Sequence, residues 1–294
     1  PHVVLLFAAA GSSFLEKSFM GRVAGIFGCR SFLFLRANRL LDQVKNNKVF
    51  RFAAKTTITK RSYLFCQGES VKEMARRYLH YVDNRIFVVP NWTADLESNT
   101  PTFEKNAYDT SVNYIFVGWV TKEKGVFTLI EAFSKLLRNH PNAKLSIVGA
   151  GKDLEAVKNL INQRNLKSVV TVYGWVNKCR VKQLLSTHDV FVLPSDTEGM
   201  PNSVIEAMSL GLPVISTPVG VMPDYFVNHE TILFVEPKNT EELYLALQKL
   251  FVSPETRKSI AMAGNQLVMC KFNPKSAIDQ LVNYLKITRE DRNV

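Results

Sequence analysis

Between residues 113 and 251 the chain alternates short apolar runs with stretches of helical periodicity, and this alternation constrains its fold more than any other feature. Strands are predicted near residues 113–118, 144–149, 169–173, 189–193, 213–216 and 231–235, and helices near 125–139, 152–164, 179–186, 202–210 and 240–251. Such alternation is typical of a doubly wound parallel α/β sheet. Ligands of these sheets bind at the carboxyl ends of the strands, so a site is expected in the loops that follow them.

A second alternation occupies the first ninety residues. Strands are predicted near residues 3–8, 32–36, 62–66 and 85–89, and helices near 14–27, 38–48 and 70–80, the last with a capping box at Ser70 and Glu73. We expect a first domain at 1–92, a linker at 93–112, a second domain at 113–272 and a final helix at 273–294. Two late helices are expected to start at Ser253-Pro254 and Asn273-Pro274, where a capping residue precedes proline.

Composition agrees with a folded cytoplasmic protein. With 294 residues, of which 46% are apolar and 21% charged, the chain can bury two sizeable cores. Its four cysteines are widely spaced and lack metal-ligand pairing, which suits a reducing compartment. No apolar run approaches the roughly 18 residues of a membrane span, and no signal peptide is recognised.

Charge is distributed unevenly along the chain. Residues 1–90 contain 15 Lys or Arg and 5 Asp or Glu, a net +10, whereas residues 91–294 carry a net +1. A basic domain that also carries many phenylalanines fits an anionic membrane surface or a nucleic acid. A third possibility is that the charge serves solubility alone.

The segment from Glu198 to Glu206 is the strongest candidate site. It follows the apolar run 190–195, and Asn202 or Ser203 is predicted to cap a helix that Gly211 ends. The N–H groups of residues 200–204 would then converge at the end of a strand and form an anion site suited to phosphate. Two carboxylates beside a phosphate suit sugar hydroxyls, so the segment predicts a sugar-nucleotide site. The alternative is a helix-capping loop with two solvated acids.

The same segment, together with residues 207–215, resembles the signature of the retaining glycosyltransferases of family 4, group 1. The resemblance implies a GT-B architecture of two Rossmann-like domains, with the first domain incomplete at its start and the last helix crossing back onto it. It implies that Glu206 binds the ribose and Glu198 the donor sugar. The backbone between them would bind the sugar and phosphates, and the residues concerned are Gly199, Met200, Pro201, Asn202 and Ser203.

The loop after residues 116–118 is the second part of this resemblance. Relatives supply an arginine and a lysine from this loop to the pyrophosphate. Lys124 matches the lysine, whereas Trp119, which follows Gly118, stands at the place of the arginine. Lys122 or Arg36 could compensate, and Lys124 could instead be a solvated loop residue.

Three further loops are expected to line the donor. Gly149 and Gly151 precede a helix, and a lone G-x-G is equally consistent with a tight turn. The resemblance implies that backbone atoms around Val176 touch the base and that the loop of Gly220 faces the donor sugar, although the latter could be a plain turn. Many relatives carry a histidine where Leu35 and Arg36 stand here, so Arg36 is a further candidate.

The expected chemistry requires no metal or other cofactor. The sequence contains no Asp-x-Asp, and none of its five histidines pairs with a cysteine or acid at metal-site spacing. Lys124 and helix amides would assist departure of the nucleoside diphosphate. The acceptor would then attack with net retention in the front-face mechanism of the family, which we favour over Glu198 as a covalent nucleophile.

We therefore expect a retaining glycosyltransferase, with a nucleotide-sugar donor and a glycan or lipid-linked acceptor, that builds cell-surface polysaccharide or glycolipid. With such acceptors an anionic membrane is favoured over nucleic acid as partner of the basic domain. The location expected is the cytoplasm, peripheral at the inner face of the membrane. Two alternatives are a nucleotide-sugar isomerase or phosphorylase on the same scaffold and a non-catalytic donor-binding subunit.

Overall fold

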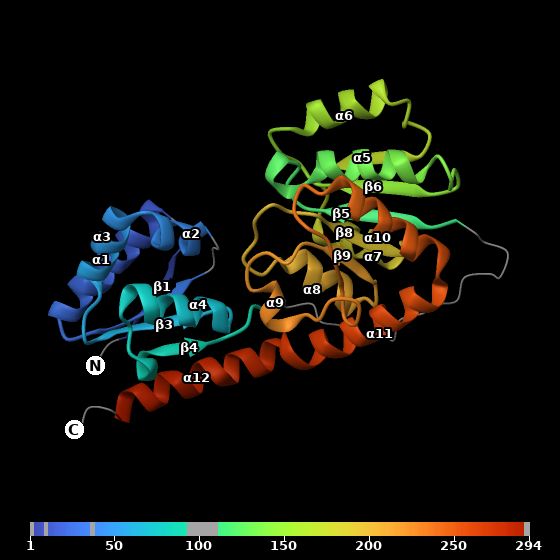
Figure 1. Ribbon diagram of the computed structural model, residues 1–294. Helices are drawn as coiled ribbons and strands as arrows, with labels where there is room; N and C mark the ends of the chain where they lie inside the picture. The colour runs from blue at the N-terminus through green and yellow to red at the C-terminus, as the bar shows by residue number, and fades with distance from the viewer. Residues whose placement is uncertain (1–2, 9–10, 36–38, 93–110, 291–294) are drawn as a thin grey trace.

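The computed structural model describes residues 3–8, 11–35, 39–92 and 111–290, which form two parallel β-sheets with helices packed on them (Figure 1). The first sheet has the order β1-β2-β3-β4 and the second the order β10-β9-β8-β5-β6-β7. The strands of the first are β1 (Val3–Ala8), β2 (Arg30–Leu35), β3 (Ser62–Cys66) and β4 (Ile86–Val88). Those of the second are β5 (Asn113–Val117), β6 (Lys144–Val148), β7 (Val170–Gly174), β8 (Val190–Leu193), β9 (Val214–Ser216) and β10 (Leu233–Phe234). The predicted α/β class is confirmed.

The helices of the first unit differ from the prediction at two places. They are α1 (Ser12–Ile26), α2 (Arg39–Asn46), α3 (Lys48–Thr57) and α4 (Glu69–Met74), which continues as a π-helical turn at Ala75–Leu79. Helix α3 was not predicted. It begins because the Asn47 side chain accepts a hydrogen bond from the Phe50 amide and so starts a new helix. The capping box at Ser70 was also wrong, since α4 begins one residue earlier and its N-cap is Gly68.

The two faces of the first sheet bury different side chains. On β2 and β3 the aliphatic residues of one face, such as Leu33 and Leu64, join the main core. The aromatic residues of the other face, such as Phe32 and Phe65, form a separate cluster with α12 (Pro274–Glu290). Successive strand residues point to opposite faces, so the alternating sequence of β2 and β3 requires cover on both sides.

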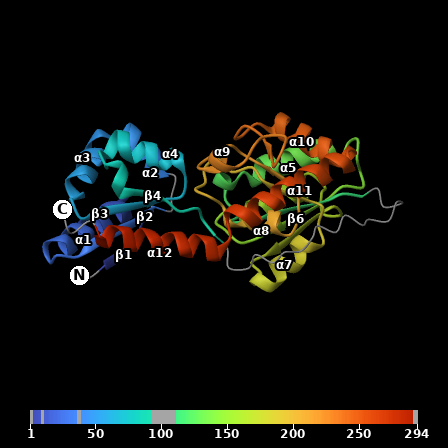
Figure 2. The same ribbon diagram turned by 90° about the horizontal axis from the view of Figure 1, so that it is seen from below.

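The last helix supplies the cover for the aromatic face. After α11 (Pro254–Lys271) leaves the second unit, α12 extends across to the first sheet, as Figure 2 shows. Its Tyr284 ring stacks on Phe87 with 4.4 Å between centroids. Both helices start as predicted, because Ser253 accepts a hydrogen bond from the Thr256 amide and Asn273 from the Lys275 amide.

In the second sheet β5 and β8 lie side by side at the centre, β6 and β7 continue to one side, and β9 and β10 continue to the other. This is the topological switch point at which open α/β sheets bind ligands. The remaining helices of this unit are α5 (Val126–Leu136), α6 (Leu154–Gln163), α7 (Lys178–Ser186), α8 (Asn202–Ser209), α9 (Met222–Tyr225) and α10 (Thr240–Val252). The loop after β5 and the loop before α8 therefore meet at the carboxyl edge of the sheet.

Candidate active site

The start of α8 differs in detail from the prediction. Neither Asn202 nor Ser203 caps the helix, because Pro201 occupies the N-cap and Asn202 is already the first helical residue. The Val204 amide donates to the Pro201 carbonyl at 3.2 Å, and proline has no N–H. Fewer amides than the predicted five are therefore available to an anion, and those of Asn202 and Ser203, in the first turn, have no acceptor within the helix.

The end of α8 agrees with the prediction. Gly211 has φ 79°, in the left-handed region, and its amide donates to the Met208 carbonyl at 3.0 Å. The next amide, of Leu212, donates to the Ala207 carbonyl at 3.0 Å. Gly211 thus ends the helix as a C-terminal glycine commonly does.

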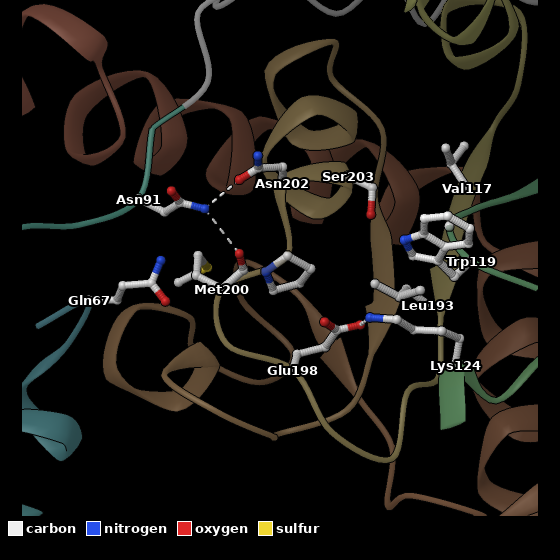
Figure 3. Close-up of a pocket in the computed structure, with 12 residues that line it drawn as sticks. Gln67, Asn91, Val117, Trp119, Lys124, Leu193, Glu198, Met200, Asn202 and Ser203 are labelled. Carbon is white, nitrogen blue, oxygen red and sulfur yellow. Dashed lines mark hydrogen bonds and ion pairs between the residues drawn. The ribbon is translucent and has the colours of Figure 1, made fainter. Parts of the chain in front are cut away.

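A cleft of about 430 Å³ lies between the two sheets at this helix start. Figure 3 shows side chains from both units around it. The lining residues are Gln67, Asn91, Val117, Gly118, Trp119, Lys124, Leu193, Glu198, Met200, Pro201, Asn202 and Ser203. The cleft therefore brings together most of the residues predicted from two separate loops of the second unit.

Lys124 and Glu198 form an ion pair in this cleft. The Lys124 Nζ lies 2.5 Å from Glu198 Oε1, and the same oxygen accepts a hydrogen bond from Ser195 Oγ at 2.7 Å. The Glu198 side chain is only 9% exposed and that of Lys124 is 25% exposed. A carboxylate this deeply buried requires such partners, and Figure 3 shows the Lys124 side chain pointing to Glu198 in the cleft that both share with the first residues of α8.

A second hollow of about 290 Å³ adjoins the cleft and shares Val117, Gly118 and Trp119 with it. The rest of its lining is mostly apolar and consists of Val148, Gly149, Ala150, Trp175, Val176 and Val181. The indoles of Trp119 and Trp175 are 67% and 76% exposed at its rim. Large exposed aromatic side chains around an apolar hollow mark a ligand-binding surface.

The two glycines of the G-x-G loop have a packing role. Gly149 has φ 136°, and a Cβ there would lie 1.9 Å from the Gly118 carbonyl oxygen. A Cβ on Gly151 would lie 2.3 Å from the Val120 carbonyl oxygen. Both positions therefore require glycine for close approach of the loops after β5 and β6, and only Gly149 also lines a hollow.

Several predicted site residues lie outside the two linings. Glu206 is half-buried on α8, on the same helix face as Ser203 but one turn further along. The Gly199 carbonyl accepts a hydrogen bond from the Val221 amide at 3.2 Å, which ties it to the loop of Gly220. Arg36 and most of the linker lie outside the described residues. The proposed contacts of these residues with a donor remain predictions.

Two residues that line the cleft, Asn91 and Gln67, were not predicted as site residues. Asn91 donates through Nδ2 to the Met200 carbonyl at 3.1 Å and also to Asn202 Oδ1. Gln67 directly follows β3 and is 4% exposed. A polar residue at the carboxyl end of a buried strand is a usable signal, and it could have identified Gln67.

Comparison with known proteins finds sequence matches among glycosyltransferases. Residues 99–267 match the family model described as glycosyl transferases group 1. An uncharacterized glycosyltransferase of Methanocaldococcus jannaschii is 30% identical over 71% of this chain and 53% of its own length. The UDP-Gal:alpha-D-GlcNAc-diphosphoundecaprenol alpha-1,3-galactosyltransferase of Escherichia coli is 33% identical over 56% of this chain and 43% of its own length. The chain thus spans about half the length of these relatives.

A solved structure extends the comparison to the whole fold. The Anabaena protein HepE, crystallised with UDP, superposes with a TM-score of 0.79 at 15% identity, and the match covers 96% of this chain and 78% of HepE. At this identity the likeness concerns the fold, and it confirms the predicted GT-B arrangement.

Proposed function

Because this chain belongs to the glycosyl transferases group 1 family, we propose that it transfers a sugar from a nucleotide-sugar donor to a glycan or lipid-linked acceptor, in the assembly of cell-surface polysaccharide or glycolipid. The observation that carries the proposal is the Lys124–Glu198 pair, at 2.5 Å, beside the first turn of α8 in the cleft between the sheets. A cation, free helix amides and a carboxylate together suit a sugar diphosphate. The Escherichia coli relative, a galactosyltransferase named for a diphosphoundecaprenol acceptor, is consistent with this proposal.

In the proposed reaction the acceptor hydroxyl attacks the anomeric carbon of the donor sugar. The bond from this carbon to the diphosphate oxygen breaks, and the hydroxyl proton passes to the released diphosphate. The positive charge of Lys124 and the amides of Asn202 and Ser203 stabilise the negative charge that develops on the leaving group. When the donor binds, its diphosphate competes with Glu198 for Lys124. Glu198 is then available to accept hydrogen bonds from sugar hydroxyls.

The mechanism proposed is front-face, with retention and without a metal. Glu198 Oε1 accepts a hydrogen bond from Ser195 Oγ that does not depend on Lys124, and a carboxylate held by a donor is a weaker nucleophile than a free one. This favours a hydrogen-bonding role for Glu198 over a covalent one. The Glu206 carboxylate, further along α8, is assigned to the ribose.

The test incubates the protein with UDP-, GDP- and ADP-glucose. Release of nucleoside diphosphate, and its stimulation by a lipid-linked or glycan acceptor, is the expected result. Glu198→Gln should abolish most of the release, whereas Glu255→Gln, at the start of α11, should not. Donor binding without any release would indicate the binding-subunit alternative, and a changed sugar without transfer would indicate an isomerase.

We also propose that the first unit attaches the protein to an anionic membrane surface at the inner face of the cytoplasmic membrane. In the described ranges no helix is long and apolar enough to cross a bilayer.

Helices α1 and α3 contact each other, and Arg22 on α1 donates to the Thr56 carbonyl on α3. Exposed apolar side chains on and beside these helices are Phe19, Ile26, Phe27, Val49 and Phe52. Exposed basic residues nearby in the chain are Lys45, Lys48, Lys60 and Arg61. Apolar and basic groups together suit an interfacial surface.

A further inference from the structure

The helix α4 of the first unit receives its N-terminal cap from the second unit. Its own N-cap residue, Gly68, has no side chain to offer. Instead Asp224 Oδ2, on α9, accepts hydrogen bonds from both the amide and the Oγ of Ser70, each at 2.9 Å. An acceptor for a first-turn amide is what a capping side chain normally provides, and a carboxylate is also favoured by the helix dipole.

Gly68 leaves room for this contact. A Cβ at Gly68 would lie 2.2 Å from Asp224 Oδ2 and 2.8 Å from the Val221 Cβ. Its φ of −165° is extended backbone that any residue adopts, so the restriction is one of space and not of conformation. The loop after β3 and the start of α9 are therefore built to touch.

A neighbouring contact fixes the residue before Gly68. The Tyr225 hydroxyl donates to the Gln67 carbonyl at 2.6 Å. Burial, with a smaller contribution from Asp224, raises the pKa of this hydroxyl, so it remains protonated and able to donate. Asp224 and Tyr225 thus hold the Gln67–Ser70 segment at both of its ends, from the second unit.

The Gln67 side chain itself lines the cleft, opposite Lys124 and Trp119 (Figure 3). The residue as a whole is 4% exposed, and its carboxamide is not among the buried side-chain atoms that lack a partner in the described residues. What little of this side chain is accessible therefore opens into the cleft that it lines. A carboxamide offers both donors and acceptors, which matches sugar hydroxyls or phosphate oxygens.

We propose that Gln67 is a donor-binding residue contributed by the first unit, and that Asp224 and Tyr225 are positioning residues that hold it over the cleft. The proposal deepens the proposed function and rests on it. It makes the contact between the two units part of the donor site, because the segment that carries Gln67 is ordered by residues of the other sheet.

The test measures the affinity of the wild type and variants for UDP-, GDP- and ADP-glucose by calorimetry. Gln67→Ala should weaken binding of the preferred conjugate about three- to tenfold, the range of one hydrogen bond. Asp224→Asn and Tyr225→Phe should each weaken it by a similar or smaller factor. The double variant Gln67→Ala/Asp224→Asn should bind no more weakly than Gln67→Ala alone, because Asp224 acts through Gln67.

Asp189→Asn is the matched control. Asp189 Oδ2 also accepts a distant backbone amide, that of Asn113 at 2.7 Å, but within the second unit. It should lower the melting temperature without changing affinity. Unchanged affinity of Gln67→Ala, or additive losses in the double variant, would overturn the inference while leaving the proposed function standing. If the wild type binds none of the conjugates, the proposed function fails too.

Discussion

Both units of this molecule are parallel β-sheets with helices packed on them, yet only the second carries sequence motifs that indicate a function. The second is close to neutral and carries the loops on which the family resemblance depends. The first carries a net +10 over residues 1–90 and many exposed apolar side chains, and it lies before residue 99, where the family match begins. Donor chemistry requires defined groups at strand ends, whereas an acceptor-side or membrane surface requires only a suitable distribution of charge and apolar area. Only the requirement for defined groups at strand ends produces a motif that can be recognised in the sequence.

The sharpest test of the second unit concerns the leaving group. Lys124→Ala should lower kcat about 100-fold or more, because charge on the diphosphate grows towards the transition state. Lys122→Ala, two residues away and outside the cleft lining, should change kcat little. Steady-state kinetics of the wild type and both variants measures these effects.

The control for this prediction deals with Glu198. Lys124→Ala leaves a carboxylate of 9% exposure without its cation, which can destabilise the fold. Adding Glu198→Gln should restore the melting temperature but not kcat. Equal, small effects of Lys122→Ala and Lys124→Ala would mean that another cation binds the diphosphate.

The next test concerns the ribose. Glu206→Gln should weaken nucleoside diphosphate binding by about 1 to 3 kcal/mol, the scale of a hydrogen bond to a charged group. Calorimetry gives the value, with Glu131→Gln on the exposed face of α5 as control. An unchanged affinity with an intact fold would remove Glu206 from the ribose.

A further test concerns the apolar hollow. Stacking of a nucleobase on an indole is worth about 1 to 3 kcal/mol, and an exposed indole should give the lower part of this range. Trp175→Ala should therefore weaken nucleotide binding about fivefold, and Trp175→Phe less.

Tryptophan fluorescence gives a second measurement of the same contact. The chain has three tryptophans, and Trp92 packs against Phe34 away from the hollow. Bound nucleotide should therefore quench the fluorescence of Trp119 and Trp175 only. Quenching that survives in the Trp119→Phe/Trp175→Phe variant would contradict the prediction.

The smallest effect per residue is expected in the first unit. The protein should co-sediment with anionic vesicles at low salt and be released as the Debye length falls to about 3 Å at 1 M. Lys48→Ala with Lys60→Ala should reduce binding by about 1 kcal/mol per charge. Lys167→Ala with Lys258→Ala, exposed residues of the second unit, should not. Equal binding to neutral and anionic vesicles would show that the basic unit is not a membrane surface.

The sequence allowed the second sheet and most of its site loops to be predicted, because buried parallel strands are continuous apolar runs and the Glu198 loop follows one of them. Local signals were less informative at helix starts. Ser70 and Asn202 both have side chains suited to capping, yet each is paired with the opposite unit, with Asp224 and Asn91 respectively. Tertiary partners changed what these residues do, and no local pattern records a partner more than a hundred residues away.

The helix α12 places the end of the chain on the sheet formed by its beginning. During synthesis the aromatic face of β2 and β3 emerges first, but the helix that covers it is made after every strand of the second sheet. Until then the aromatic face that holds Phe32 and Phe65 lacks its covering helix, a situation that favours aggregation of nascent chains. The first sheet is therefore translated before the second but completed after it, and a chaperone that shields apolar surface would act on this protein before α12 is released.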